Sequence, residues 1–224
     1  APSYGLCLGR LYPQADVISM NVERARRGIA GNDGEVIEKL SSAQLVVGLL
    51  HNNEIRNLIP NSAICIDIPG YLFMGLHPDI MNCSGLEKAP EVAPLKNGNI
   101  VSRIAAIGYL NGFTEKETVS CFHAGTYEEL GYFNYRAAED ALLMRFKPVR
   151  EHLVDRLSSW VSSGKFAFTH NHPRGNVLFD VLTSFLLHYE VGFDIAPARV
   201  SKKGIPNLLA QGPQYPVYPE IAEQ

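Results

Sequence analysis

Short apolar segments that alternate with amphipathic ones predict an α/β fold. Residues 44–50 (QLVVGLL) and 63–68 (AICIDI) are nearly continuous aliphatic runs with the length of buried strands. Residues 16–20 (DVISM) and 165–169 (KFAFT) predict two further strands, and helices are expected over residues 4–11 and 34–40. Each strand is followed by a helix or a loop in place of a tight hairpin turn. We therefore expect the four strands to form one parallel sheet.

The second half of the chain has a largely helical pattern. One helix is expected over residues 100–110, and Thr114 with Glu117 forms a capping-box pattern at the start of the next helix. Residues 135–160 carry an apolar stripe at steps of three and four, which Pro148 should kink or divide into two helices. A further apolar helix face spans residues 177–189. The Pro- and Gly-rich tail that follows is expected to run over the surface in extended form.

Composition excludes several classes of protein. The 224 residues are 46% hydrophobic and 19% charged, which is a globular balance and not that of a disordered chain. The net charge of −3 argues against a protein whose main partner is nucleic acid or an anionic membrane surface. Every apolar run falls far short of the roughly 20 residues that span a bilayer. We therefore expect no nucleic-acid partner and no membrane-spanning segment.

The cysteine pattern predicts neither a structural metal site nor disulfide staples. The four cysteines lie at positions 7, 65, 83 and 121, and no two of them have Cys-x-x-Cys spacing. A chain of this length can bury a core without disulfides, so reduced thiols in a cytoplasmic protein are the expected state. No metal is expected.

The segment from Thr169 to Asn176 is the most informative for chemistry. A strand leads into it and a helix leaves it, and it contains His170, Asn171, His172 and Arg174. Histidine titrates near neutral pH and is the commonest general base, and a guanidinium beside a helix start can hold a phosphate. If the strand continues, both imidazoles point to the same face. The alternative is a polar loop whose histidines only cap the strand and the helix.

Two further strand ends carry histidines. His77 and Asp79 follow the strand over residues 63–68, and they are close enough for one to orient the other. His51 follows the strand over residues 44–50. In a parallel sheet the loops that begin at His51, Gly70 and His170 emerge at one edge, so we expect them to form one pocket. A turn stabilised by Asp79 is the alternative, and we expect His123 at the C-terminal end of a helix.

The order of four motifs resembles the WcbI-like polysaccharide biosynthesis enzymes. The motifs are IPGYLFMGLHPD (68–79), NGFTEKE (111–117), FHAGTYEELGYF (122–133) and FAFTHNHPRGNVLFDVL (166–182). The matched features, which include the strands and helices around these motifs, cover about residues 16–189. They lie within a single domain over residues 1–224 whose last part, 190–224, is the tail. The resemblance implies a parallel-sheet core like that of SGNH-type hydrolases with a large helical second half.

The resemblance also implies an activity. Members of this family bind coenzyme A and are expected to transfer an acyl group, acetyl above all, to a capsular or other surface glycan. They open with a strand and a Gly-Asn-Cys-Gln turn that supplies a nucleophile, whereas this sequence starts at residues that resemble those after the turn. The first strand and the nucleophile turn are therefore expected to be missing, and Cys7, inside the first helix, is a poor substitute.

On this interpretation the site residues have distinct roles. His172 is the general base, His170 and Asn171 position it or donate to the oxyanion, and Arg174 contacts phosphate. His77 and Asp79 are expected to help bind acetyl-CoA, which enters as a co-substrate beside a glycan acceptor. Two other functions stay open: an SGNH-like esterase that removes acyl groups from glycans, and a non-catalytic glycan-binding or scaffold module.

Overall fold

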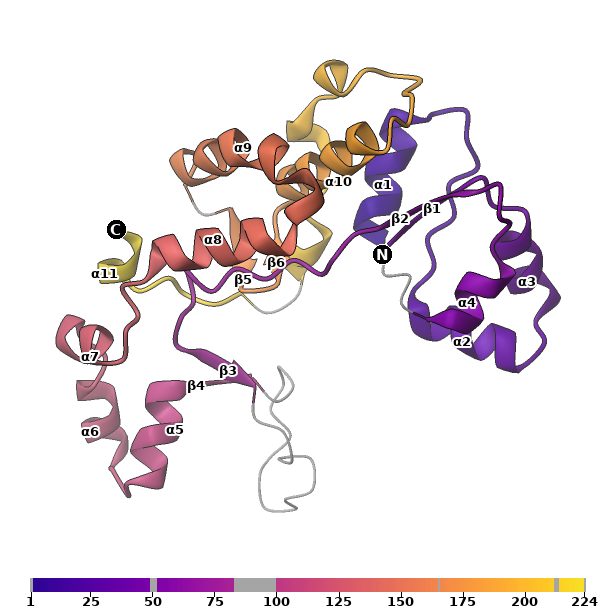
Figure 1. The fold of residues 1–224 in the computed structure, drawn as a ribbon. Helices are drawn as coiled ribbons and strands as arrows, with labels where there is room; N and C mark the ends of the chain where they lie inside the picture. The colour runs from indigo at the N-terminus through magenta and orange to yellow at the C-terminus, as the bar shows by residue number, and fades with distance from the viewer. Residues whose placement is uncertain (1, 49–51, 83–99, 165, 212–213, 224) are drawn as a thin grey trace. The chain divides into compact units, whose positions relative to one another are not determined.

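The computed structural model describes residues 2–48, 52–82, 100–164, 166–211 and 214–223, which form two compact units (Figure 1). The first unit combines residues 1–71, 143–166 and 173–211, and the second combines residues 72–142, 167–172 and 212–224. Each unit is assembled from segments far apart in the sequence. The single domain expected over residues 1–224 remains a prediction.

The first unit contains the parallel strand pair that the sequence predicts. Strands β1 (Leu45–Gly48) and β2 (Ile64–Asp67) pair in parallel, with Leu45 opposite Ile64. Helices α2 (Val22–Ala30), α3 (Gly34–Ser41) and α4 (Asn53–Leu58) belong to the same region. Their inner faces meet in a small core around Ala25, Ile55 and Ile59. Each of these helices begins at an Asn or Asp whose side chain accepts backbone N–H groups (Asn21, Asp33 and Asn52).

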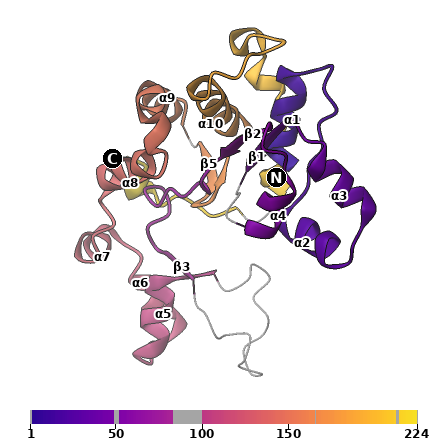
Figure 2. The same cartoon turned by 45° about the vertical axis from the view of Figure 1, so that its right-hand side comes forward.

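Helix α10 (Gly175–His188) is the central element of the rest of the first unit, and α1 (Pro2–Leu11) and α9 (Arg150–Ser162) lie on either side of it (Figure 2). Most of its side chains are buried, as expected for a helix that is apolar on several faces. At Gly175 an added Cβ would lie 2.9 Å from the Ile205 side chain, so the glycine permits a close approach of the tail. The tail is not simply extended: it forms 3₁₀ turns η3 (Pro197–Arg199), η4 (Lys202–Gly204) and η5 (Leu208–Gln211).

The break at Pro148 is confirmed. Helix α8 (Tyr135–Arg145) ends before it, the 3₁₀ turn η2 (Lys147–Val149) contains it, and α9 follows at Arg150. Proline removes one backbone donor and clashes with the preceding turn, so the apolar stripe continues over two consecutive helices.

The second unit combines a short ribbon with several helices. Strands β3 (Ile80–Asn82) and β4 (Ile100–Ser102) pair antiparallel, and helices α5 (Arg103–Leu110), α6 (Glu115–Ser120) and α7 (Ala124–Glu129) follow. The unit also holds most of α8, strand β5 (Ala167–Thr169) and helix α11 (Pro219–Ala222). Its core is formed by Ile104, Tyr127, Tyr132 and Ile221.

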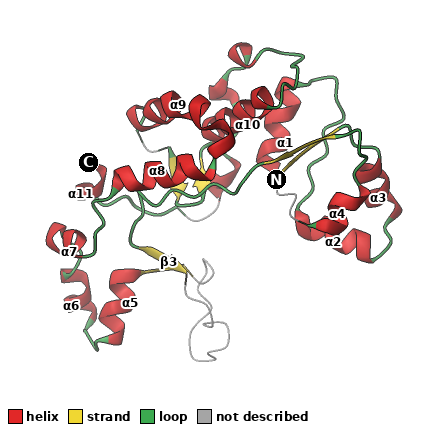
Figure 3. Cartoon of the chain, viewed as in Figure 1, coloured by secondary structure: helices red, strands yellow, loops and turns green. Residues whose placement is uncertain are grey.

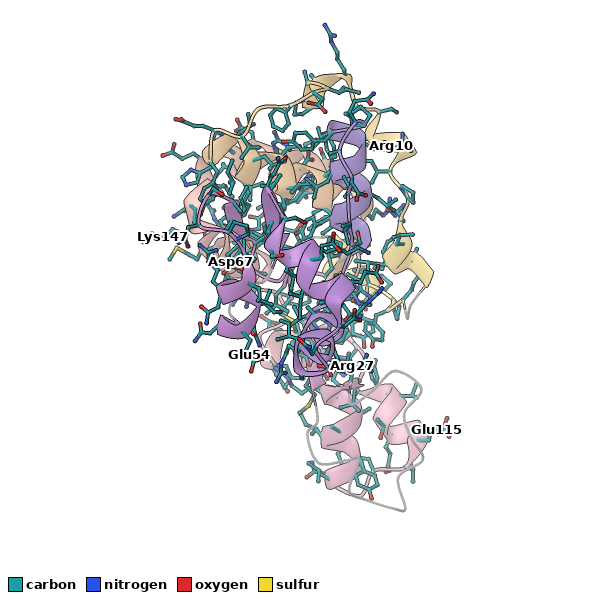
Figure 4. All side chains as sticks on the ribbon, turned by 90° about the vertical axis from the view of Figure 1, so that its right-hand side faces the viewer. Arg10, Arg27, Glu54, Asp67, Glu115 and Lys147 are labelled. Atoms are coloured by element: carbon teal, nitrogen blue, oxygen red, sulfur yellow. The ribbon has the colours of Figure 1, made fainter. Side chains whose placement is uncertain are left out.

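Two expectations for this unit have different outcomes. The capping box at α6 is confirmed, because the Thr114 hydroxyl accepts from the Glu117 N–H and the Glu117 carboxylate accepts from the Thr114 N–H. Glu115, in the first turn of the same helix, projects into solvent (Figure 4). The single helix expected over residues 100–110 is wrong at its start: residues 100–102 pair with β3, and Ser102 caps a helix that begins at Arg103.

One four-stranded parallel sheet is not confirmed. The described residues form three separate two-stranded sheets, β1–β2, β3–β4 and β5–β6, the last with β6 at His172–Pro173 (Figure 3). Residues 16–20 form no strand; Ser19 instead lies against Gly5 of α1. The likeness to SGNH-type hydrolases is likewise not confirmed. In the described ranges, no helix is both long and apolar enough to cross a bilayer.

Candidate active site

The histidine pair lies where β5 ends. Residues 166–170 are buried, and His170 is only 5% exposed. The chain turns at His170 and Asn171 before β6 begins at His172, which is half-buried. The strand therefore does not continue through both histidines, and the alternation that would have put them on one strand face does not apply. The turn gives them different exposures: His170 is enclosed, and His172 can be reached from solvent.

Both imidazoles are held in an environment that disfavours their charged form. Burial lowers the pKa of His170 below the ordinary value of 6.5, and the neighbouring His172 lowers it further. Burial also lowers the pKa of His172. The Nδ1 atoms of both rings are buried and have no hydrogen-bond partner among the described residues. Each ring is therefore neutral at pH 7 and has a buried nitrogen that a substrate group could satisfy.

Asn171 is exposed at the tip of this turn. Its side-chain oxygen accepts a hydrogen bond of 2.9 Å from the Thr169 hydroxyl. This contact fixes the amide orientation and directs the NH₂ group away from Thr169. The predicted oxyanion donor is thus oriented by its own strand.

Asp79 is a buried carboxylate with three donors. It is 2% exposed and accepts hydrogen bonds from the hydroxyls of Tyr132 and Tyr218, both at 2.8 Å, and from the backbone N–H of Ile104 at 3.0 Å. Burial and these bonds raise the pKa of both tyrosines, so both stay protonated donors. Asp79 thereby ties the start of α5 to the C-terminal segment. These contacts give it a positioning role, and its direct contact with coenzyme A remains a prediction.

A cavity of about 210 Å³ lies beside Asp79. Its walls come from residues 76–80, from β4 and from the C-terminal residues Tyr215, Pro216 and Tyr218. His77 is 3% exposed and lines this cavity, with its ring edge-on to Tyr215 at a centroid distance of 6.1 Å. The motif over residues 68–79 therefore contributes to a space that could hold a small ligand.

Backbone hydrogen bonds connect the surroundings of the cavity to β5 and to His170, which follows it. The His170 carbonyl accepts from the Phe73 N–H at 2.7 Å, and the Phe168 carbonyl accepts from the Tyr215 N–H at 3.1 Å. Tyr215 of the C-terminal wall thus bonds to β5, and Phe73, which precedes the wall over residues 76–80, bonds to the residue that follows β5. His170 and His172 do not line the cavity, so one pocket that contains all four predicted residues remains a prediction, and His51 lies outside the described residues.

The structure also shows the local surroundings of two other residues that the sequence singles out. Arg174, in the first unit, precedes α10; its N–H donates to the Phe166 carbonyl and its side chain makes no capping hydrogen bond. Its phosphate contact remains a prediction. His123 is not at a helix C-terminus as expected, because it is the N-cap of α7, where Nδ1 accepts from the Thr126 N–H. A capping histidine of this kind has a structural role.

The described residues support neither a nucleophilic role for Cys7 nor a bound metal ion. Cys7 is fully buried in α1, and burial raises its pKa to about 12, so its thiol is not a nucleophile at neutral pH. In the ranges that the structure describes, no group of three or more His, Cys, Asp or Glu side chains is placed to hold a metal ion.

The tyrosine contacts of Asp79 lead to a first prediction. Tyr218→Phe removes one hydrogen bond to a buried carboxylate, and we expect it to lower the free energy of unfolding by about 1.5–3 kcal/mol. Chemical denaturation measures this change, and limited proteolysis should show earlier cleavage of the C-terminal segment. Tyr109→Phe, at a tyrosine that is 83% exposed, is the matched control. Equal stabilities of the two variants would contradict the role given to Asp79.

Comparison with known proteins supports the interpretation of the motifs. The family described as polysaccharide biosynthesis enzyme WcbI matches residues 18–192. The chain has a fold similar to that of a solved structure of WcbI, which is described as a polysaccharide biosynthesis enzyme. That structure is of the native protein without a disulfide bond between coenzyme A and a cysteine. The TM-score is 0.54 at 13% identity, over 89% of this chain and 72% of that one. No curated protein matches the chain. The family match covers most of the sequence, and the chain belongs to the WcbI family of polysaccharide biosynthesis enzymes.

Proposed function

We propose that this protein is a coenzyme A-dependent acyltransferase that acylates a sugar hydroxyl during polysaccharide biosynthesis. The observation that carries the proposal is the pair of histidines at the end of β5, whose pKa values burial lowers and each of which has a buried ring nitrogen without a hydrogen-bond partner among the described residues. Membership of the WcbI family supplies the substrate class, and the coenzyme A named for the WcbI structure suggests the donor.

His172 is the proposed general base. A sugar hydroxyl is a weak nucleophile at neutral pH, and removal of its proton by a positioned base contributes typically 10²–10⁴-fold to the rate. The imidazole takes this proton while the hydroxyl oxygen forms a bond to the thioester carbonyl carbon. The C–S bond breaks, and the imidazolium returns the proton to the leaving thiolate. The step consumes no other reactant.

The neighbours of His172 have supporting roles in this proposal. Pro173 has a fixed φ angle and biases His172 toward extended backbone, which places the base at a defined point of β6. His170, which is more deeply buried, positions it, and the Asn171 amide, oriented by Thr169, donates to the carbonyl oxygen as negative charge develops. Arg174 remains the predicted phosphate ligand, since a guanidinium can bind phosphate through two hydrogen bonds.

A transfer assay separates this proposal from the alternatives. The protein is incubated with acetyl-CoA or longer acyl-CoA and a panel of sugars, and thiol release is followed with a chromogenic disulfide reagent. We expect coenzyme A binding by calorimetry and thiol release that depends on the sugar. Deacylation of acylated sugars with water alone would favour the esterase, and sugar binding without either reaction would favour the glycan-binding module.

The lowered histidine pKa values predict the pH profile of the transfer. Only the neutral imidazole can accept a proton, so kcat/KM should be constant around pH 7 and fall on the acid side. Because burial lowers the pKa of His172 in the folded protein, the midpoint of this fall should lie below 6.5. Rates measured from pH 5 to pH 8 test this expectation, and a midpoint above 6.5 would contradict it. His152→Ala, at an exposed histidine of α9, should leave the profile unchanged.

A further inference from the structure

The cavity beside Asp79 has walls that are mainly apolar. Leu76 and Ile80 line it from one side, Ile100 and Val101 from β4, and Pro216 from the C-terminal segment. Its volume is about 210 Å³. A ligand in this space would gain mainly from the removal of apolar surface from water.

Several polar groups of the lining are already engaged within the protein. The Asp79 oxygens accept from Tyr132, Tyr218 and Ile104, so the Tyr218 hydroxyl is committed as well. The Ser102 hydroxyl accepts from the Ala105 N–H at the start of α5. A sugar ring would bring about five hydroxyl groups that need partners, and each one left unsatisfied on burial costs about 1–3 kcal/mol. The chemistry of the lining therefore favours an apolar ligand over a sugar.

The volume of this partly open cavity indicates how much of a ligand it can enclose. At roughly 30 Å³ for each water-sized group, the cavity holds about seven non-hydrogen atoms. An acetyl group has three and would leave more than half of the cavity empty. A linear acyl group of about four to six carbons, with its carbonyl oxygen, has about five to seven and fills the space.

We infer that this cavity binds the acyl chain of the donor and selects acyl groups of about four to six carbons over acetyl. The inference rests on the proposed acyl transfer and names the class of donor. It agrees with the backbone hydrogen bond from Tyr215 of the cavity wall to the Phe168 carbonyl of β5. The C-terminal wall of the chain-binding space is thus tied to the strand that leads to the proposed base.

Stable thioethers of coenzyme A test the inference without turnover. Calorimetry with S-methyl-, S-propyl-, S-butyl- and S-hexyl-CoA measures affinity against chain length. Burial of one methylene is worth roughly 0.8 kcal/mol, so we expect the affinity to rise up to about fourfold per added carbon and to stop rising near six carbons. The variant Val101→Phe places a larger ring in the cavity. Its affinity should increase less than twofold per added carbon, while S-methyl-CoA should bind as it does to the wild type.

Further variants test whether the chain-length dependence of the affinity arises in this cavity. Leu76→Phe enlarges a lining side chain outside the ribbon and should repeat the result of Val101→Phe, which covers the case in which one of them fails to fold. Val119→Phe makes the same Val-to-Phe change at an exposed residue of α6 that does not line the cavity, and should keep the wild-type chain-length dependence. Two results would overturn the acyl-chain site: an affinity that does not change with chain length, or a chain-length dependence that both filling variants retain. Either result would leave the transferase proposal intact. No binding of any coenzyme A thioether overturns both.

Discussion

His172→Ala is expected to lower the turnover number of acyl transfer by at least about a hundredfold. The variant removes the half-buried imidazole whose lowered pKa keeps it neutral and able to take a proton at pH 7. An interaction that acts on the proton in transit contributes mainly to the transition state, so the affinity for coenzyme A should change little. Steady-state rates and calorimetry with coenzyme A measure the two quantities separately.

Three further variants make this result specific. His172→Asn keeps a polar side chain without a basic nitrogen and should lose as much activity, which covers the case in which the alanine variant is unstable. His152→Ala, at an exposed histidine, should behave as the wild type. Near-normal turnover of either His172 variant would show that the base lies elsewhere. A larger loss in His170→Ala would then assign that role to His170.

Local features of the sequence were sufficient to predict most of the separate elements. The runs around Leu45 and Ile64 form strands because they are rich in β-branched and aliphatic residues, which favour extended backbone. Pro148 separates α8 from α9 because its ring removes a backbone donor and fixes φ. The capping box at Thr114 depends on residues three apart. Each of these signals lies within a few positions of the structure that it predicts.

Assembly of the strands could not be predicted in the same way. Residues 100–102 have the apolar character of the helix that follows, and only their pairing with residues 80–82 makes them a strand. The partner is about twenty positions away and leaves no periodic trace in the local pattern. The Ser102 side chain, which caps α5, was the one local sign that the helix begins at Arg103.

The candidate site likewise combines features that the local sequence predicts with contacts that it does not. The crowding of His170, Asn171 and His172 at a strand end was visible in the sequence, whereas the partners of Asp79 were not. Tyr132 and Tyr218 are 53 and 139 positions away from Asp79, and tyrosines of this kind are common in any core. The role of Asp79 in the cavity wall becomes visible only in the folded chain, where these distant segments meet at its carboxylate.

Asp180 in the first unit is another buried carboxylate whose partners are distant in sequence. It is 3% exposed and lies within the apolar run of α10. One oxygen accepts from Arg156 at 2.8 Å and from Lys202 at 2.6 Å, and the other accepts from the Trp160 indole N–H at 2.8 Å. The carboxylate thus joins α9, α10 and η4. An acidic residue between the apolar Phe179 and Val181 was the sequence signal that could have identified it.

Asp180→Ala is therefore expected to lower the free energy of unfolding by about 3–5 kcal/mol, because it leaves the buried indole N–H without its acceptor and two cations without their counter-charge. For a chain of this size the change corresponds to a fall in melting temperature of roughly 6–20 °C, which a thermal scan measures. Asp155→Ala, at an exposed carboxylate on α9, should shift it by less than about 2 °C. In a double-mutant cycle, Arg156→Ala should cost less on the Asp180→Ala background than alone, since its partner is already gone. Additive effects of the two substitutions would show that the ion pair does not hold these helices together, and the stabilisation would then come from apolar packing around Trp160.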